Sequence, residues 1–193
     1  SDPSGGAQYH DVIQRFQMVS TANASDVGNL LTTGGNMGCA GHSDIANAYG
    51  YSSSGSNPAS NVIQRYAMVS SGHAADVGDL TIAVSGGRAG HSSLVAGYTT
   101  GTNEGQVHDA LDKFAFAATS SSTDIGSLGA GRFDGSGTSS LDFGYHSGGG
   151  ISGGAAYQTT IRKFSFSNDS AATTAVGDLN EAVTYCTSVC PQV

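Results

Sequence analysis

The chain is short of the residues and patterns that mark several large protein classes. It has no Trp, three Pro and only 11% charged residues among 193 positions. No run approaches the roughly 18 apolar residues of a membrane-spanning helix, and the sequence does not open with the basic and apolar stretches of a signal peptide. We therefore expect no membrane insertion.

Basic residues are also scarce. Seven Lys and Arg against fifteen Asp and Glu give a net charge of −8 at pH 7. A surface with that charge repels a phosphate backbone, so nucleic acid is not an expected partner.

Helical periodicity is missing as well. No segment of about 10 residues or more places apolar side chains at i, i+3, i+4 and i+7, which argues against helices. The 29 Gly and the abundant Ser, Thr and Ala resemble the composition of a disordered linker, but an internal repeat argues for a folded chain.

A phrase of an aliphatic residue, a spacer, a cation and an aromatic residue occurs four times. Its copies begin at intervals of 50, 48 and 50 residues and read Ile13-Gln14-Arg15-Phe16, Ile63-Gln64-Arg65-Tyr66, Leu111-Asp112-Lys113-Phe114 and Ile161-Arg162-Lys163-Phe164. Ten or eleven residues after each aromatic comes a second phrase, which reads Asp26-Val27-Gly28-Asn29-Leu30, Asp76-Val77-Gly78-Asp79-Leu80, Asp124-Ile125-Gly126-Ser127-Leu128 and Ala175-Val176-Gly177-Asp178-Leu179. We expect one domain over 1–193, with units anchored near 12–30, 62–80, 110–128 and 160–179 and a tail at 180–193.

A third phrase follows the second in three of the copies. It leads from Gly41-His42-Ser43 to Gly50-Tyr51, from Gly90-His91-Ser92 to Gly97-Tyr98, and from Gly137-Thr138-Ser139 to Gly144-Tyr145. A Gly-Tyr step followed by small polar residues is typical of a strand that runs into a hairpin loop. The chain therefore holds between three and four units, and whether it is a fragment of a longer repeat protein stays open.

The first two phrases predict specific local structures. In the first phrase, the aromatic residue and the residue two positions later point to the same face of a strand, and we expect these pairs to be buried between stacked sheets. The pairs are Phe16 and Met18, Tyr66 and Met68, Phe114 and Phe116, and Phe164 and Phe166. In the second phrase, the Asp side chain can bond the backbone two residues on, in a turn whose Gly permits a positive φ.

Units of about fifty residues with three or four short strands predict an all-β fold of the β-propeller type, because propeller blades are four-stranded repeats of about 40 to 50 residues. The number of units favours a partial or a small closed propeller. A parallel β-helix, which needs shorter coils of about 20 to 25 residues, and an open antiparallel array are the alternatives.

Over residues 5–180 the chain resembles the RCC1- or kelch-like repeats of large tail and fibre proteins of marine bacteriophages and of secreted bacterial proteins. The likeness lies in the stretch VIQRYAMVSSGHAADVGDLTIAVSGGRAGHSSLVAGYTTG, and its most specific element is the Asp-Val-Gly-Asp-Leu phrase behind a cation–aromatic pair. Ser127, Thr138 and Ala175 depart from the pattern. The resemblance implies a display module on a virion surface or outside the cell, without catalytic residues.

One cation recurs in every unit and one carboxylate in three of them. The cations are Arg15, Arg65, Lys113 and Lys163, and the carboxylates are Asp26, Asp76 and Asp124. Because buried cations are normally paired, we expect a row of structural ion pairs between the two sets. An anion or sialylated-glycan site along the cations is the alternative.

We expect no catalytic residues, no metal site and no cofactor. His42 and His91 occupy equivalent positions, but a zinc site needs further ligands, and Thr138 breaks the series. The Gly-His-Ser phrase is not a nucleophile elbow, and the carboxylates outside the repeats share no motif that would pair them for glycoside hydrolysis. A secreted polysaccharide-active enzyme is therefore the least favoured function.

The loops at 51–61, 98–109 and 145–158 differ in length and chemistry among the units. Loops of a repeat fold gather on one face, so ligand binding is expected there. The candidate contacts carry groups suited to sugars and are Ser53, Asn57, Asn103, Glu104, His146 and Tyr157. Solvated turns have the same composition.

Three cysteines leave the pairing open. A disulfide between Cys186 and Cys190 requires a turn, since an extended strand would separate their Cα atoms by roughly 13 Å. A bond from Cys39 to one of them, three buried thiols, and metal binding are the alternatives.

These observations favour a non-enzymatic structural or adhesive module of an extracellular or virion-surface assembly, such as a phage fibre or decoration component. Its expected partners are protein subunits of a larger assembly, in a homo-oligomer. The alternative is a lectin-like propeller that binds surface glycans.

Overall fold

The repeated phrases form strands that pair in the same order each time. The computed structural model describes residues 10–17, 19, 21–31, 38–55, 58–102, 108–151, 157–169 and 171–184. Within these ranges there are strands and no helix, and hence none that could span a membrane. The all-β expectation is confirmed.

Three four-stranded antiparallel sheets make up most of the fold. Sheet 1 contains β3 (Ala40–Asp44), β4 (Tyr49–Ser53), β5 (Ser60–Ala67) and β6 (Ala75–Val84). Sheet 2 contains β7 (Ala89–Ser92), β8 (Ala96–Thr100), β9 (Ala110–Ala115) and β10 (Thr123–Ser127), with β16 (Ala171–Ala172) added in parallel to β10. Sheet 3 contains β12 (Ser136–Ser139), β13 (Phe143–Ser147), β15 (Thr160–Ser165) and β17 (Thr174–Asp178).

Two shorter pairs complete the described strands. β1 (Val12–Arg15) and β2 (Ser25–Asn29) carry the same phrases as the last two strands of each four-stranded sheet. β11 (Arg132–Phe133) pairs with β14 (Gly150–Ile151) beside sheet 3.

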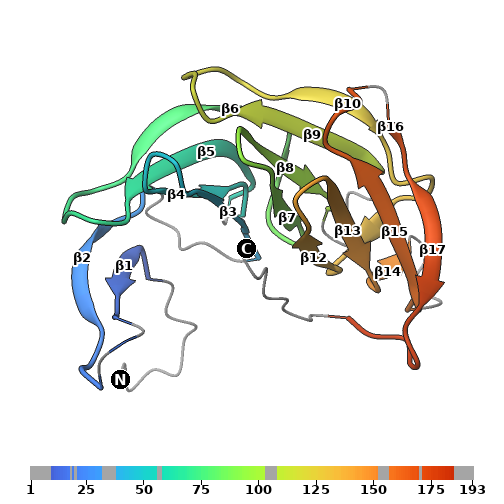
Figure 1. The fold of residues 1–193 in the computed structure, drawn as a ribbon, viewed down its shortest axis with the longest axis horizontal. Coiled ribbons are helices and arrows are strands. Elements are labelled where there is room, and N and C mark those ends of the chain that lie inside the picture. The colour runs from blue at the N-terminus through green and yellow to red at the C-terminus, as the bar shows by residue number, and fades with distance from the viewer. Residues whose placement is uncertain are drawn as a thin grey trace.

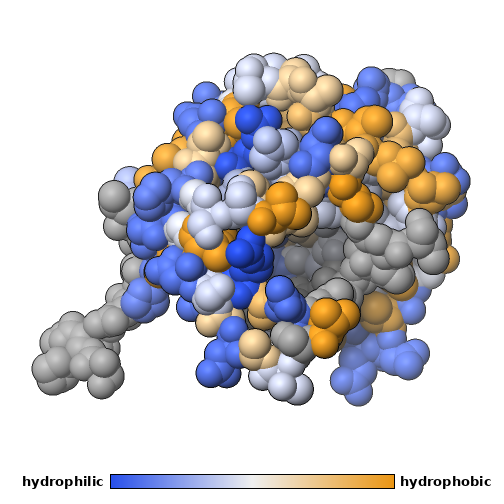
Figure 2. Space-filling view, turned by 60° about the vertical axis from the view of Figure 1, so that its left-hand side comes forward, coloured by the Kyte–Doolittle hydropathy of each residue, from blue (hydrophilic) through white to orange (hydrophobic). Residues whose placement is uncertain are grey.

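The sheets follow one another along an arc, from β1 and β2 at one end to β17 at the other (Figure 1). The first strand of each four-stranded sheet lies on the inner side of this arc, and β7 packs between β3 and β12. Figure 2 shows one side of this stack, with polar and apolar side chains interspersed over the surface.

Aromatic residues fill the space between successive sheets. Tyr51 of sheet 1 stacks on Phe116 of sheet 2 with ring centroids 4.9 Å apart, and the imidazole of His42 meets the ring of Phe114 edge-on at 5.0 Å. The same two contacts recur between sheets 2 and 3, where Tyr98 stacks on Phe166 and His91 meets Phe164 edge-on. Offset and edge-on ring contacts of this kind add to the free energy gained by burial.

The expected burial of the recurring pairs is wrong for Phe16 in the first copy and for Met68, which is exposed, in the second; Met18 lies outside the described residues. Phe114 and Phe164 are 3% and 2% exposed, whereas Phe16 is 66% exposed and Tyr66 is half-buried. The reason is that a buried ring in this series packs against the preceding sheet. Among the described residues, no sheet precedes β1 and β2, and only two strands precede sheet 1.

Glycine is required where these rings lie across a neighbouring strand. Gly97 is directly opposite Phe114 in the pairing of β8 with β9, and a Cβ atom at Gly97 would lie 2.3 Å from the ring. The inner strands approach each other still more directly, since a Cβ atom at Gly90 would lie 2.2 Å from the carbonyl oxygen of Gly41.

We expect Gly90→Ala to destabilise the protein strongly and Gly41→Ala to be nearly neutral. The first change forces a methyl group against a backbone oxygen, and overpacking of this kind costs about 1–3 kcal/mol or more. Gly41 occupies the matching place in sheet 1, where nothing lies within 4 Å of the added atom. Urea unfolding of both variants measures the difference, and equal midpoints would contradict the close approach of β3 and β7.

Candidate functional site

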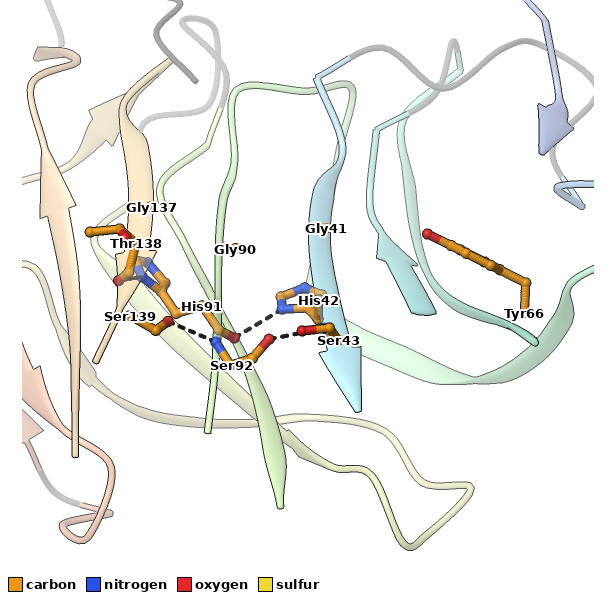
Figure 3. Close-up of a pocket in the computed structure, with 10 residues that line it drawn as sticks. All are labelled: Gly41, His42, Ser43, Tyr66, Gly90, His91, Ser92, Gly137, Thr138 and Ser139. Atoms are coloured by element: carbon orange, nitrogen blue, oxygen red, sulfur yellow. Dashed lines mark hydrogen bonds between the residues drawn. The ribbon is translucent and has the colours of Figure 1, made fainter. Parts of the chain in front are cut away.

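The inner side of the arc holds a pocket of about 300 Å³ (Figure 3). Three copies of the third phrase line it, on β3, β7 and β12, and Tyr66 of β5 points its hydroxyl toward β3. The lining residues are Gly41, His42, Ser43, Tyr66, Gly90, His91, Ser92, Gly137, Thr138 and Ser139.

Two buried histidines tie adjacent inner strands together. The Nδ1 atom of His42 lies 3.1 Å from the carbonyl oxygen of His91, and its Nε2 atom lies 2.9 Å from Oγ of Ser53. His91 repeats this arrangement one sheet further on, with the carbonyl of Thr138 and the hydroxyl of Thr100 at the same distances. Since a carbonyl only accepts, this network assigns the proton to Nδ1 and makes Nε2 an acceptor from the hydroxyl.

Serine hydroxyls add a second link between the same strands. The backbone N–H of Ser43 donates to Oγ of Ser92, and that of Ser92 donates to Oγ of Ser139, each at 3.0 Å. Each residue of the Gly-His-Ser phrase therefore has a structural role. The Gly allows two backbones to approach closely, and the His and the Ser each form a hydrogen bond to the next sheet.

Burial keeps these imidazoles neutral. Removal from water lowers the pKa of His42 and of His91 to about 4, although the hydrogen bond to a carbonyl raises each in part. The pKa of His146 falls to about 3, because of burial and then the charges of His91, Arg132 and Arg162. Both ring nitrogens of His42 and His91 are already bonded, so neither ring offers a free nitrogen to a metal or a substrate.

A buried ion pair lies where β9 of sheet 2 meets β6 of sheet 1. Arg88 and Asp112 meet at 3.2 Å, and both side chains are fully shielded from water. Arg88 also donates to the carbonyl of Ile82 at 3.0 Å, and the hydroxyl of Thr81 donates to the carboxylate at 2.6 Å. Burial lowers the pKa of Arg88, and the carboxylate of Asp112 opposes that shift. The extra hydrogen bonds are what a buried pair needs to offset its desolvation.

Sheet 3 places a cation where sheet 2 has this carboxylate. Arg162 occupies the position of Asp112 in the first phrase, and Arg132 is buried nearby. Arg132 donates to the carbonyl of Gly148 at 2.9 Å, and Arg162 donates to the hydroxyl of Thr173 at 3.3 Å. Burial lowers the pKa of Arg132, and the charge of Arg162 lowers it further. Within the described ranges neither guanidinium forms an ion pair.

Sequence reasoning missed these buried charges. The signal was the second residue of the first phrase, which changes its chemistry from copy to copy and was treated as a spacer. It is Gln14, Gln64, Asp112 and Arg162 in turn.

The expected row of ion pairs is wrong. The Oδ1 atoms of its carboxylates accept the N–H of the Gly two residues on, at 3.0 Å in each case, in the Asx turns that the phrase predicts. The carboxylates are Asp26, Asp76 and Asp124, and none pairs with a cation of the row, although all these residues are described. Register explains this, because Gln14 lies opposite Asp26 and Arg15 opposite Ser25, so that the two charges point to opposite faces.

Three of the four cations of the row lie over aromatic rings instead. Arg65 is 4.6 Å from the ring centroid of Tyr49, and Lys163 is 4.5 Å from that of Phe143. Lys113 lies 5.8 Å from the ring of Tyr98 and also forms an ion pair with Asp169. Arg15 donates to the carbonyl of Met68 at 3.4 Å. Cation–π contacts of this kind hold each charged group against the face of an aromatic ring at the surface of its sheet.

The candidate ligand contacts separate into three groups. Ser53 and His146 were expected in loops, but they lie in β4 and β13 and are fully buried in the hydrogen-bond network. Tyr157 is 55% exposed beside Gly150, where it can meet a ligand. The remaining candidates, Asn57, Asn103 and Glu104, lie outside the described residues.

One of the three cysteines lies within the described residues. Cys39 is a free, half-buried thiol. Cys186 and Cys190 lie outside the described residues. Across the part of the chain that the structure describes, no three His, Cys, Asp or Glu side chains gather closely enough to hold a metal ion.

No protein-family model matches the chain, and no curated protein matches it.

We expect Asp112→Asn to cost about 3–5 kcal/mol in the free energy of unfolding, because it leaves the charge of Arg88 buried without a counter-ion. Asp169→Asn breaks the exposed pair with Lys113 and should cost at most about 1 kcal/mol. Denaturant unfolding compares the two. Similar small losses would show that Arg88 reaches solvent.

We also expect stability to fall between pH 7 and pH 5. Because the folded pKa values of His42 and His91 are about 4, the unfolded chain takes up protons near pH 6.5 that the folded chain does not. Each such histidine lowers the free energy of unfolding by roughly 1.4 kcal/mol per pH unit below that point, and the loss is absent above pH 7. Urea unfolding across this range measures the slope for the wild type and for His42→Gln. The variant should lose one histidine's share of the slope, and an unchanged slope would count against a buried neutral His42.

Proposed function

We propose that the chain is a β-propeller-like repeat module with a structural, non-enzymatic role in an extracellular or virion-surface assembly. The observation that carries this proposal is the repetition of one set of contacts between successive sheets. Imidazole, hydroxyl and aromatic groups that elsewhere perform chemistry are engaged here in holding sheet to sheet.

The propeller assignment is supported by the arrangement of the sheets. Each is a four-stranded antiparallel meander, and the first strand of each lies on the inner side of the arc (Figure 1). Adjacent inner strands are close enough for direct hydrogen bonds, as in blades arranged around a common axis.

The structural role is supported by the state of the polar groups. His42 and His91 are neutral, and both nitrogens of each are bonded. The buried carboxylate of Asp112 is held by Arg88 and Thr81. A general base needs a free lone pair within reach of a substrate proton, and none of these groups offers one.

One observation favours a lectin-like function as the second candidate. The pocket on the inner strands combines a tyrosine ring with polar backbone and hydroxyl groups, a combination that suits a sugar. Tyr66 supplies the ring and Thr138 one of the hydroxyls (Figure 3).

A glycan array separates the two functions. We expect no selective, saturable binding by the wild-type protein. Tyr66→Ala removes the ring in the pocket, and Leu94→Ser serves as the control at an exposed apolar side chain that does not line the pocket. Selective binding that Tyr66→Ala abolishes and Leu94→Ser leaves intact would replace the structural proposal with the lectin.

A further inference from the structure

The outer strand of a sheet is covered by the loop of the next sheet along the arc. At β2, the N–H groups of Gly72 and Ala74 donate to the carbonyls of Val27 and Asn29, at 2.7 and 2.9 Å. At β6, the N–H of Ser122 donates to the carbonyl of Asp79 at 2.7 Å. At β10, the parallel strand β16 takes this place. The three outer edges are therefore paired, as edge strands in stable proteins usually are.

The outer strand of sheet 3 has the same sequence pattern, but no segment among the described residues covers it in this way. Val27, Val77 and Ile125, which share one position in the second phrase, are 8%, 6% and 7% exposed, whereas Val176 is 48% exposed. Every residue of β17 is exposed.

The glycines of the second phrase give an independent measure of the same difference. A Cβ atom at Gly28 would lie 2.1 Å from the carbonyl oxygen of Gly72, and one at Gly78 would lie 2.5 Å from that of Ser120. A Cβ atom at Gly177 meets nothing within 4 Å. At β17, the contact surface is therefore present, and no segment in the described part of the chain fills it.

The other end of the arc carries the complementary half. Phe16 is exposed, although its counterparts in β9 and β15 are buried against the preceding sheet. Ala22 and Ala24, in the loop between β1 and β2, correspond to Gly72 and Ala74 fifty residues later, and both are exposed. Their N–H groups therefore correspond to those of Gly72 and Ala74, which donate to the outer strand β2 inside the chain.

We propose that a second copy of this chain covers β17, with the loop between β1 and β2 of one copy bonded to the β17 edge of another. This inference rests on the proposed structural function and names its partner. In this contact the N–H groups of Ala22 and Ala24 donate to carbonyl oxygens on the edge of β17 that does not pair with β15, and the carbonyl of Ala22 packs against Gly177. Phe16 of one copy reaches Tyr145 of the other, which is half-buried where its counterparts Tyr51 and Tyr98 are buried.

The contact is head-to-tail, because it joins two different surfaces of the chain. Such an interface extends an assembly until a ring closes or a filament forms. It also accounts for both uncovered surfaces at once, through the same backbone pairing and ring packing that hold the sheets together inside one chain.

Sedimentation velocity from low micromolar concentration to the solubility limit tests this contact. The wild type should form assemblies that grow with concentration. Gly177→Ala should weaken association by roughly tenfold or more, because the added methyl group meets the partner's backbone. It should leave the unfolding midpoint of the monomer unchanged, since the added Cβ atom meets nothing within 4 Å in the described chain. Phe16→Ser should weaken association from the other end.

Mixing the two variants makes the test specific to a head-to-tail contact. Each variant keeps one competent surface, so an equimolar mixture should form dimers and nothing larger. Gly41→Ala and Val69→Ser are the matched controls, because they change an open glycine and an exposed apolar residue outside the contact and should associate like the wild type.

Several results would overturn the inference. A wild type that stays monomeric throughout, an assembly that Gly177→Ala does not affect, or controls that weaken it equally would each do so. None of these bears on the glycan array, which tests the structural function itself. Selective sugar binding would remove that function even if the chain associates.

Discussion

The fold depends on the hydrogen bond that a buried, neutral imidazole donates to the backbone of the next sheet. His42 and His91 can make this bond only if the inner strands lie in direct contact. That contact requires glycine at Gly90 and Gly137, where any side chain would meet a backbone oxygen. With the inner strands fixed, the rings of Phe114 and Phe164 have only one place to lie, against the imidazole and across the glycine of the neighbouring strand. Sheet spacing, ring packing and histidine protonation are thus consequences of a single geometric requirement.

Most of the repeated structure can be predicted from the sequence, because it follows from local rules. Alternation along a strand predicts which residue shares a face with Phe114, and the Asp-x-Gly spacing predicts the Asx turn. The failure of the expected ion pairs could not be foreseen in this way, because it depends on which faces of the strands Arg15 and Asp26 occupy. A shift of register between Ile13 and Gln14 sets that relation, and the two phrases alone do not reveal it.

The burial of Ser53 and His146 was hidden for a related reason. Both follow a Gly-Tyr step and look like the start of a polar loop, yet each forms a hydrogen bond to a neighbouring sheet, Ser53 with Thr99 and His146 with Thr100, and so stays within its strand. In a single sheet, polar residues at the end of a strand are exposed to solvent. In a stack of sheets, the same residues can be buried because the next sheet supplies their hydrogen-bond partners. The pattern along one strand does not distinguish these cases, because the partner lies about fifty residues away.

The units resemble one another in contacts between sheets and differ in what each sheet encloses. The position of Asp112 holds a carboxylate in sheet 2, a guanidinium in sheet 3 and an amide in sheet 1, while the glycines and rings around it hardly change. Contacts between neighbours carry the stability of repeat proteins, so this division leaves single positions open to variation. The cost falls on the two ends of the arc, where a sheet has one described neighbour in place of two. Phe16 and Val176 are exposed there because the residues at their positions in the other units are buried by a neighbouring sheet, and no described residue does so at the ends.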